Sequence, residues 1–228
     1  MIIERSDLRD TTRVFRNRTH AGEILAEMLE EFRGSDAIVL GIPAGGVPVA
    51  AEVARRLQLP LDVAVASKVL LPWTTEAGYG AVAFDGNVWI NQEYVAHYGL
   101  SPATVEEGIA RARAKVEQRV RRFRGDRPMP ELRGRAVILV DDGLAAGSTL
   151  RAAISAVKKA GAGRIIVAVP TGHAHAVKSI AREVEALYCA NIRSGLRFAV
   201  ADAYENWTDV DEAEVDALLQ ELKSESDR

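Results

Sequence analysis

The chain has 228 residues, of which 48% are hydrophobic and 27% are charged, as in an ordinary globular protein. Its formal net charge of −3 disfavours nonspecific binding to nucleic acid, which needs a clustered positive surface. No apolar run approaches the roughly 20 residues that span a bilayer, and the first residues lack the apolar segment of a signal peptide. We therefore expect a cytoplasmic protein with neither a membrane nor a nucleic acid as partner.

Hydrophobic periodicity predicts alternating helices and strands. Apolar residues at helical spacing predict a first helix at 19–32, and the apolar run at 37–42 is typical of a strand buried on both faces of a parallel sheet. Asp85-Gly86 predicts the turn of a hairpin. The same reasoning predicts strands at 61–67, 136–140, 164–169 and 184–189, and helices at 47–57, 101–123, 148–160, from 174, and at 210–222.

This alternation predicts an α/β fold, a doubly wound and mainly parallel sheet with helices on both faces. Residues 1–228 are expected to form a single domain. In such sheets ligands bind beyond the carboxyl ends of the strands, which directs attention to the loops after residues 42, 67, 140 and 169.

Cys189 is the only cysteine, so it cannot form an internal disulfide. It lies in an apolar, strand-like run, which predicts a buried thiol in a reducing compartment. No neighbouring base or cation favours a catalytic role.

The segment VILVDDGLAAGST, from Val137 to Thr149, joins a strand, two acids and a glycine-rich turn that opens a helix. Its glycines let successive backbone N–H groups converge, and the helix start adds partial positive charge, so the segment is suited to hold a phosphate. It is not a Walker motif, because Gly147 is followed directly by Ser148 rather than by lysine.

The acid pair Asp141-Asp142 by itself allows several roles. The carboxylates could accept hydrogen bonds from the vicinal hydroxyls of a sugar, each contributing about 1.5–3 kcal/mol. They could equally cap a turn, or hold a metal as in phosphoacceptor proteins. A phosphorylated ribose would offer both the hydroxyls and the phosphate.

Four apolar residues, two acids, a short linker and Gly-Ser-Thr resemble the 5-phosphoribosyl 1-diphosphate (PRPP) motif of type I phosphoribosyltransferases. The resemblance implies that fold, with a small hood at about 190–207 and a lid loop at about 69–90. It assigns the ribose hydroxyls to Asp141 and Asp142. It assigns the 5-phosphate to Gly143, Leu144, Ala145, Ala146, Gly147, Ser148 and Thr149.

The residues inside the motif narrow the acceptor. Hypoxanthine-type enzymes carry an aspartate where this chain has Ala145, and that acid handles the purine N7 proton. Adenine- and uracil-type enzymes tolerate alanine there, and orotate-type enzymes carry alanine at the position of Ala146. A hypoxanthine or guanine acceptor is therefore disfavoured.

GIPAGGVPVA, from Gly41, resembles PRGGVPVA of uncharacterised bacterial and archaeal phosphoribosyltransferase-like proteins, with Ala44 in place of arginine. The resemblance implies diphosphate binding by Ala44, Gly45 and Gly46 and by Lys68 at the end of the next strand. On their own, these residues could be an ordinary strand–helix turn and a solvated lysine. The loss of the arginine weakens the expectation of diphosphate affinity and of turnover.

The resemblance also places a lid over the site and a hood over the base. Lys68 and Glu76 are the candidate catalytic residues, and Tyr79 is a candidate lid contact. Trp73 would be an unusual exposed side chain unless it packs on a neighbour. Aromatic residues of the hood are candidates for stacking on the acceptor, although each could instead be hood core: Phe198, Tyr204 and Trp207.

Two further patterns have ordinary explanations. His173 and His175 have a spacing that suits a metal, but no third ligand is evident, which favours a polar helix start. The basic stretch at 111–124 has an apolar stripe at helical spacing, which favours a solvated or subunit-facing helix.

The resemblance therefore implies Mg²⁺-dependent transfer of a 5-phosphoribosyl group from PRPP to a nitrogenous base, with release of diphosphate. The Mg²⁺ would be held by PRPP, with Asp141 and Asp142 as candidate ligands, and a homodimer is the candidate assembly. Two alternatives remain, a PRPP-sensing regulatory protein and a phosphoaccepting acidic site. The first expectation to test is that Asp142→Asn weakens PRPP binding with little loss of stability.

Overall fold

The computed structural model describes residues 1–75 and 77–226, with side chains as far as residue 222. Its main sheet has six strands, and every pair of neighbours in it is parallel. Their order is β1 (Ile2–Glu4), β9 (Ala186–Arg193), β8 (Arg164–His173), β7 (Ala136–Val140), β2 (Ile38–Gly41) and β3 (Leu61–Val63). The predicted parallel α/β sheet is confirmed.

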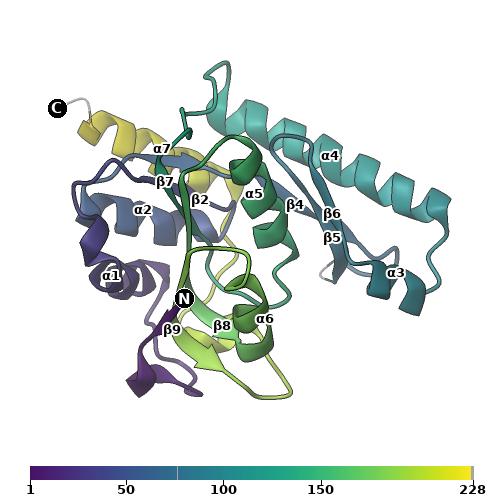
Figure 1. Ribbon diagram of the computed structural model, residues 1–228, viewed down its shortest axis with the longest axis horizontal. Coiled ribbons are helices and arrows are strands. Elements are labelled where there is room, and N and C mark those ends of the chain that lie inside the picture. The colour runs from purple at the N-terminus through teal and green to yellow at the C-terminus, as the bar shows by residue number, and fades with distance from the viewer. Residues whose placement is uncertain (76, 227–228) are drawn as a thin grey trace.

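Helices cover both faces of this sheet (Figure 1). The helices α1 (Arg18–Met28) and α2 (Gly46–Leu57) pack on one face, and α5 (Ser148–Lys159) and α6 (Ala174–Ile180) pack on the other. Neighbouring residues of a strand point to opposite faces of the sheet. Ile138 therefore belongs to the hydrophobic cluster on the face covered by α1 and α2, and Leu139 to the cluster on the face covered by α5 and α6. The sheet is doubly wound, as its apolar runs predicted.

A smaller antiparallel sheet lies beside α5 and carries a third cluster of buried residues. It consists of β4 (Ala66–Leu70), β5 (Gly78–Ala83) and β6 (Val88–Ile90), and Asp85-Gly86 lies in the turn between the last two, as predicted. The helices α3 (Gln92–His97), α4 (Pro102–Arg124) and α7 (Glu212–Ser226) complete the fold, and α4 packs on β4 and β5.

Prediction failed where a buried run changes sheets. The single strand expected at 61–67 is two strands, since β3 belongs to the main sheet and β4 to the small one. Residues 62–67 are all buried, so their pattern carries no sign of the change. The lid loop expected at about 69–90 is largely strand, because β4 continues to Leu70 and β5 and β6 lie within that range. Lys68 of β4 lies opposite Ala81 of β5.

Candidate active site

The acid pair lies at the carboxyl end of β7, near the centre of the main sheet. The Asp142 backbone N–H donates to Oδ1 of Asp141 at 2.9 Å. Burial, and then the charge of Asp142, raises the pKa of the Asp141 carboxyl well above its usual range. The charge of Lys68 opposes this shift, so a lysine on β4 of the small sheet acts electrostatically on the acid pair of the main sheet.

Asp142 forms a buried ion pair with Arg18, the first residue of α1. Nε and Nη2 of Arg18 donate to the same oxygen, Oδ2 of Asp142, at 3.0 and 2.9 Å. Burial raises the pKa of the Asp142 carboxyl above its usual value, and the charge and hydrogen bonds of Arg18 offset only part of that rise. Sequence reasoning missed Arg18. The sequence did contain one signal for its role. Arg18 directly follows Asn17, the N-cap of α1, and the positive end of a helix favours an acidic partner.

The glycine-rich segment is anchored through Leu144. Its side chain is 1% exposed, its N–H donates to the Thr171 carbonyl at 2.9 Å, and its carbonyl accepts from His173 N–H at 2.9 Å. Leu144 was predicted to bind the 5-phosphate, but its N–H is already used, so it cannot donate to an anion. Leu144 instead fixes the loop to β8.

The next amides are free to bind an anion. Within the part of the chain that the structure describes, the backbone N–H groups of Ala145, Ala146, Gly147 and Ser148 donate no hydrogen bond. Gly147 has φ of 80°, a left-handed conformation that glycine adopts at little cost, and it precedes the first turn of α5. This row of N–H groups at a helix start is suited to bind a phosphate.

The loop after β2 lies directly against the acid pair. A Cβ on Gly45 would come within 1.9 Å of Oδ2 of Asp142, and one on Gly46 within 2.8 Å of the Asp141 Cα. The Pro43–Ala44 peptide bond in this loop is cis. Residues 44–46 and the segment after β7 therefore flank the same two carboxylates, and only glycine fits at position 45.

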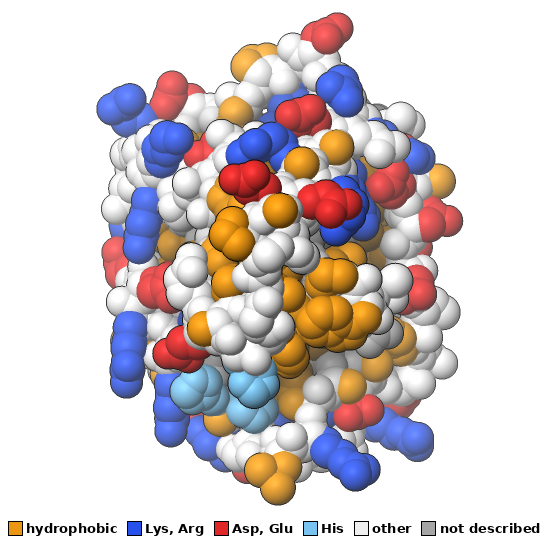
Figure 2. Space-filling view, turned by 90° about the vertical axis from the view of Figure 1, so that its right-hand side faces the viewer, with side chains coloured by type: hydrophobic (Ala, Val, Ile, Leu, Met, Phe, Trp, Pro, Cys, Tyr) orange, Lys and Arg blue, Asp and Glu red, His pale blue; other side chains and the backbone are white. Residues whose placement is uncertain are grey.

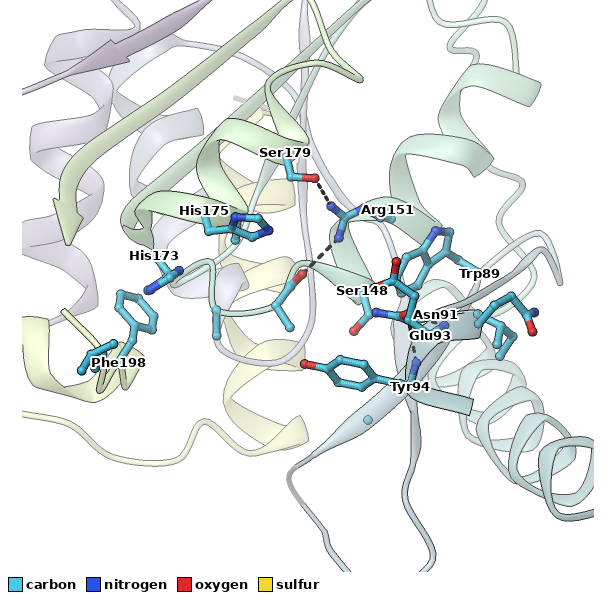
Figure 3. Close-up of a pocket in the computed structure, with 17 residues that line it drawn as sticks. Trp89, Asn91, Glu93, Tyr94, Ser148, Arg151, His173, His175, Ser179 and Phe198 are labelled. Atoms are coloured by element: carbon cyan, nitrogen blue, oxygen red, sulfur yellow. Dashed lines mark hydrogen bonds between the residues drawn. The ribbon is translucent and has the colours of Figure 1, made fainter. Parts of the chain in front are cut away.

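A cavity of about 730 Å³ opens beside the glycine-rich segment. Ala145, Ala146 and Ser148 line it together with Arg151. In Figure 3, His173 and Phe198 lie on one side of it and Trp89 and Tyr94 on the other. The rings of Phe198, Trp89 and Tyr94 offer flat, largely apolar surfaces beside the candidate phosphate site.

Arg151 on α5 stabilises this segment from behind. It donates to the Ala146 carbonyl at 3.1 Å, to the Ser179 hydroxyl at 2.7 Å and to the Glu183 carboxylate at 3.0 Å. Its guanidinium also lies 5.1 Å from the centre of the Trp89 ring. One side chain thus links the segment to α6 and β6.

The three hood aromatics differ in their positions. Phe198 lines the cavity, with the Arg193 guanidinium 4.3 Å from its ring centre. Tyr204 is only 3% exposed, and its hydroxyl donates to the Asp142 carbonyl at 2.7 Å. Trp207 lies 3.9 Å from the Arg18 guanidinium. Tyr204 and Trp207, predicted as stacking candidates, instead support the acid pair, which leaves Phe198 as the candidate.

The remaining predicted residues fall in several places. Glu76, the second candidate catalytic residue, lies outside the described residues. Tyr79 is 1% exposed in the third cluster, so it does not reach the site surface. Trp73 is 62% exposed, and the centre of its ring lies 5.7 Å from that of Tyr98.

Figure 2 shows the side of the molecule on which α3 and α4 lie. Hydrophobic side chains gather near the centre of this face.

The two patterns with ordinary explanations also have structural outcomes. His173 precedes α6 as its N-cap, and the described residues contain no group of three side chains suited to a metal. In the basic stretch, Arg119 and Arg122 pair with Glu212 of α7 at 2.9 and 3.0 Å. None of the helices in the described ranges is both long and apolar enough to cross a membrane.

Comparison with known proteins matches residues 11–202 to the model of the phosphoribosyl transferase domain. The chain belongs to this family. A protein of Mycobacterium tuberculosis H37Rv named "Putative phosphoribosyl transferase Rv0571c" is 37% identical over 207 residues. The match covers 91% of this chain and 46% of that protein, so the chain spans about half the length of the curated relatives it matches.

Solved structures agree on the fold of this phosphoribosyl transferase domain. The protein TT1426 of Thermus thermophilus is 37% identical, with a TM-score of 0.73 over 91% of this chain and 98% of that one. AQ2163 of Aquifex aeolicus is 13% identical, with a TM-score of 0.50 over 90% and 91% of the two chains, a likeness that concerns the fold alone.

Proposed function

We propose that this phosphoribosyl transferase domain transfers the 5-phosphoribosyl group of PRPP to a nitrogenous base and releases diphosphate. One observation carries the proposal. The carboxylates of Asp141 and Asp142 lie between a row of free N–H groups and the close-packed loop at Gly45-Gly46. PRPP has the matching order of groups, a 5-phosphate, vicinal hydroxyls and a diphosphate.

Each part has a distinct role in the proposed reaction. The N–H groups of residues 145–148 bind the 5-phosphate, and the acid pair orients the ribose. Positive charge develops at C1 and negative charge on the departing diphosphate, so the carboxylates stabilise the first, and Lys68 with the Gly45 N–H stabilises the second. Gly46 permits the close approach of the loop, but its N–H already donates to the Ile42 carbonyl at 3.1 Å. Ala44 contributes no charge there, because it stands in place of the arginine of similar proteins.

The residues present suit Mg²⁺ bound together with PRPP. Mg²⁺ prefers oxygen ligands and is commonly held by one or two carboxylates plus substrate phosphates. Asp141 is the better candidate ligand, since Oδ2 of Asp142 already accepts from Arg18. When bound, the ion would neutralise charge on the diphosphate.

The acceptor is proposed to enter from the side of β8. The diphosphate loop follows β2 on one flank of β7, and the cavity with Phe198 lies toward β8 on the other flank. Displacement at C1 needs the acceptor opposite the leaving group, so a flat base would stack on Phe198. Cytoplasmic location and a homodimer remain predictions.

A regulatory protein that senses PRPP is the second candidate, favoured by Ala44, which removes a cation from the diphosphate loop. Diphosphate release is to be measured with Mg·PRPP and a panel of purines and pyrimidines, alongside PRPP affinity by calorimetry. Release with at least one base supports the transferase. Tight binding without release for any base supports the sensor, and no binding of PRPP overturns both.

A further inference from the structure

Arg18 is built into the site as a fixed partner of Asp142. Its residue exposure is 8%, and the two donors that it directs to Oδ2 of Asp142 form a charge-assisted pair. Its third nitrogen, Nη1, donates to the Thr208 carbonyl at 2.7 Å, and its planar group lies 3.9 Å from the Trp207 ring centre. The guanidinium therefore has little freedom to move.

Asp142 is held from the other directions as well. Its carbonyl accepts from the Tyr204 hydroxyl at 2.7 Å, and its carboxylate lies under Gly45, where a Cβ would meet Oδ2 at 1.9 Å. The side chain remains 17% exposed. Without Arg18, this buried carboxylate would lose the ion pair that orients it.

The hydrogen bonds divide the four oxygens of the acid pair. Oδ2 of Asp142 is used by Arg18, and Oδ1 of Asp141 is used by the Asp142 N–H. Oδ2 of Asp142 accepts two hydrogen bonds, which occupy both of its lone pairs, whereas Oδ1 of Asp141 accepts only one. On Asp142, therefore, Oδ1 is the oxygen that can accept from a sugar hydroxyl. A pair of vicinal hydroxyls needs just one acceptor from each acid.

We propose that Arg18 is a positioning residue that commits Asp142 to present Oδ1 alone to the ribose, so that α1 and the hood control PRPP binding through one guanidinium. This inference rests on the proposed function. It predicts that Arg18 and Asp142 act as a unit, although they lie 124 positions apart in the chain.

The test is a double-mutant cycle on Mg·PRPP affinity, measured by calorimetry with wild type, Arg18→Met, Asp142→Asn and the double variant. Arg18→Met should raise Kd about tenfold or more, and Asp142→Asn should add little in the Arg18→Met background. The control is Arg119→Met with Glu212→Gln, an ion pair of 2.9 Å between α4 and α7 whose loss should leave Kd unchanged.

Two ligands separate positioning from general damage. Ribose 5-phosphate, which carries the hydroxyls, should bind more weakly to Arg18→Met, whereas inorganic phosphate should bind as to wild type. Arg18→Lys keeps the positive charge but cannot make both hydrogen bonds to Asp142, so it should show the same selective loss. It replaces Arg18→Met in the test if that variant does not fold.

Three results would overturn the inference. They are unchanged PRPP affinity in Arg18→Lys or Arg18→Met, additive effects in the cycle, and equal weakening of ribose 5-phosphate and inorganic phosphate. In those cases wild type still binds PRPP and the proposed function stands. Failure of wild type to bind PRPP would instead overturn the proposed function.

Discussion

At the scale of single residues, the site combines buried charge with close backbone contact. Asp141 and Asp142 both have raised carboxyl pKa values because burial penalises their charged forms. Arg18 and Lys68 oppose that effect from two different elements. Holding negative charge in this buried site lowers the free energy of unfolding. A substitution that removes the charge can therefore stabilise the fold while it weakens binding.

Asp141→Asn should make the ligand-free protein more stable at neutral pH while weakening PRPP binding. The raised pKa means that the folded protein holds this proton more tightly than the unfolded chain does, so ionisation of Asp141 destabilises the fold as pH rises. The Tm advantage of Asn over Asp should be largest at pH 8 and vanish below about pH 3, where Asp is protonated in both states. A Tm advantage that grows on acidification would contradict this reasoning.

Asp142→Asn should behave differently, and the structure revises the expectation drawn from the sequence. The variant leaves the buried Arg18 charge without its partner. We now expect a loss of about 1.5–3 kcal/mol in unfolding free energy, the size of a hydrogen bond to a charged group, together with weaker PRPP binding. Urea titration of both proteins measures it, and equal midpoints and slopes would count against a stabilising pair.

Gly45→Ala should impair binding with little effect elsewhere. The new methyl group would lie 1.9 Å from Oδ2 of Asp142, so either the carboxylate or the loop has to shift. We expect PRPP affinity to fall about tenfold or more, in line with overpacking costs of about 1–3 kcal/mol. Gly195→Ala is the matched control, since its nearest neighbour would be 3.5 Å away. Wild-type affinity in Gly45→Ala would refute the close packing.

At the scale of elements, the glycine-rich segment depends on helices and strands around it. Leu144 joins it to β8, and Arg151 joins it to α6 and to Trp89 on β6. These contacts fix where the free N–H groups point, and pre-arranged donors bind an anion with little loss of entropy.

Arg151→Met should therefore weaken phosphate ligands although Arg151 need not touch them. Loss of its hydrogen bond to the Ala146 carbonyl loosens the segment. We expect a loss of about 1 kcal/mol in binding free energy, which raises Kd for ribose 5-phosphate roughly fivefold. Arg121→Met on the exposed side of α4 is the control. The same Kd in Arg151→Met and wild type would show that the segment holds its shape without Arg151.

At the scale of the whole molecule, the main sheet encloses Cys189 completely. It is 0% exposed on β9, and burial raises the pKa of its thiol. Both effects suppress the reactive thiolate. The predicted buried thiol is confirmed.

Labelling of Cys189 should consequently report unfolding of the whole domain. A thiol reagent such as Ellman's reagent should leave the native protein unmodified and react with one thiol per chain in denaturant. Rapid reaction under native conditions would mean that β9 opens locally.

Most of the local features of the chain follow from its residue pattern. Short apolar runs marked β2, β7 and β8, since strands buried on both faces need them, and the turn at Asp85-Gly86 was predicted from two residues. The acid pair and the glycines after it were found because their chemistry depends on neighbours in the chain. Three-residue β1 has too few positions to show a period, so it was missed.

The way in which distant segments meet depends on tertiary packing. The Arg18–Asp142 pair, the use of the Leu144 N–H by β8 and the approach of Lys68 from a second sheet all depend on packing between elements far apart in the chain. Periodicity records which face of an element is buried, but not which charge another element places against it. That is why the acid pair could be predicted, while the partners that set its charge and orientation could not.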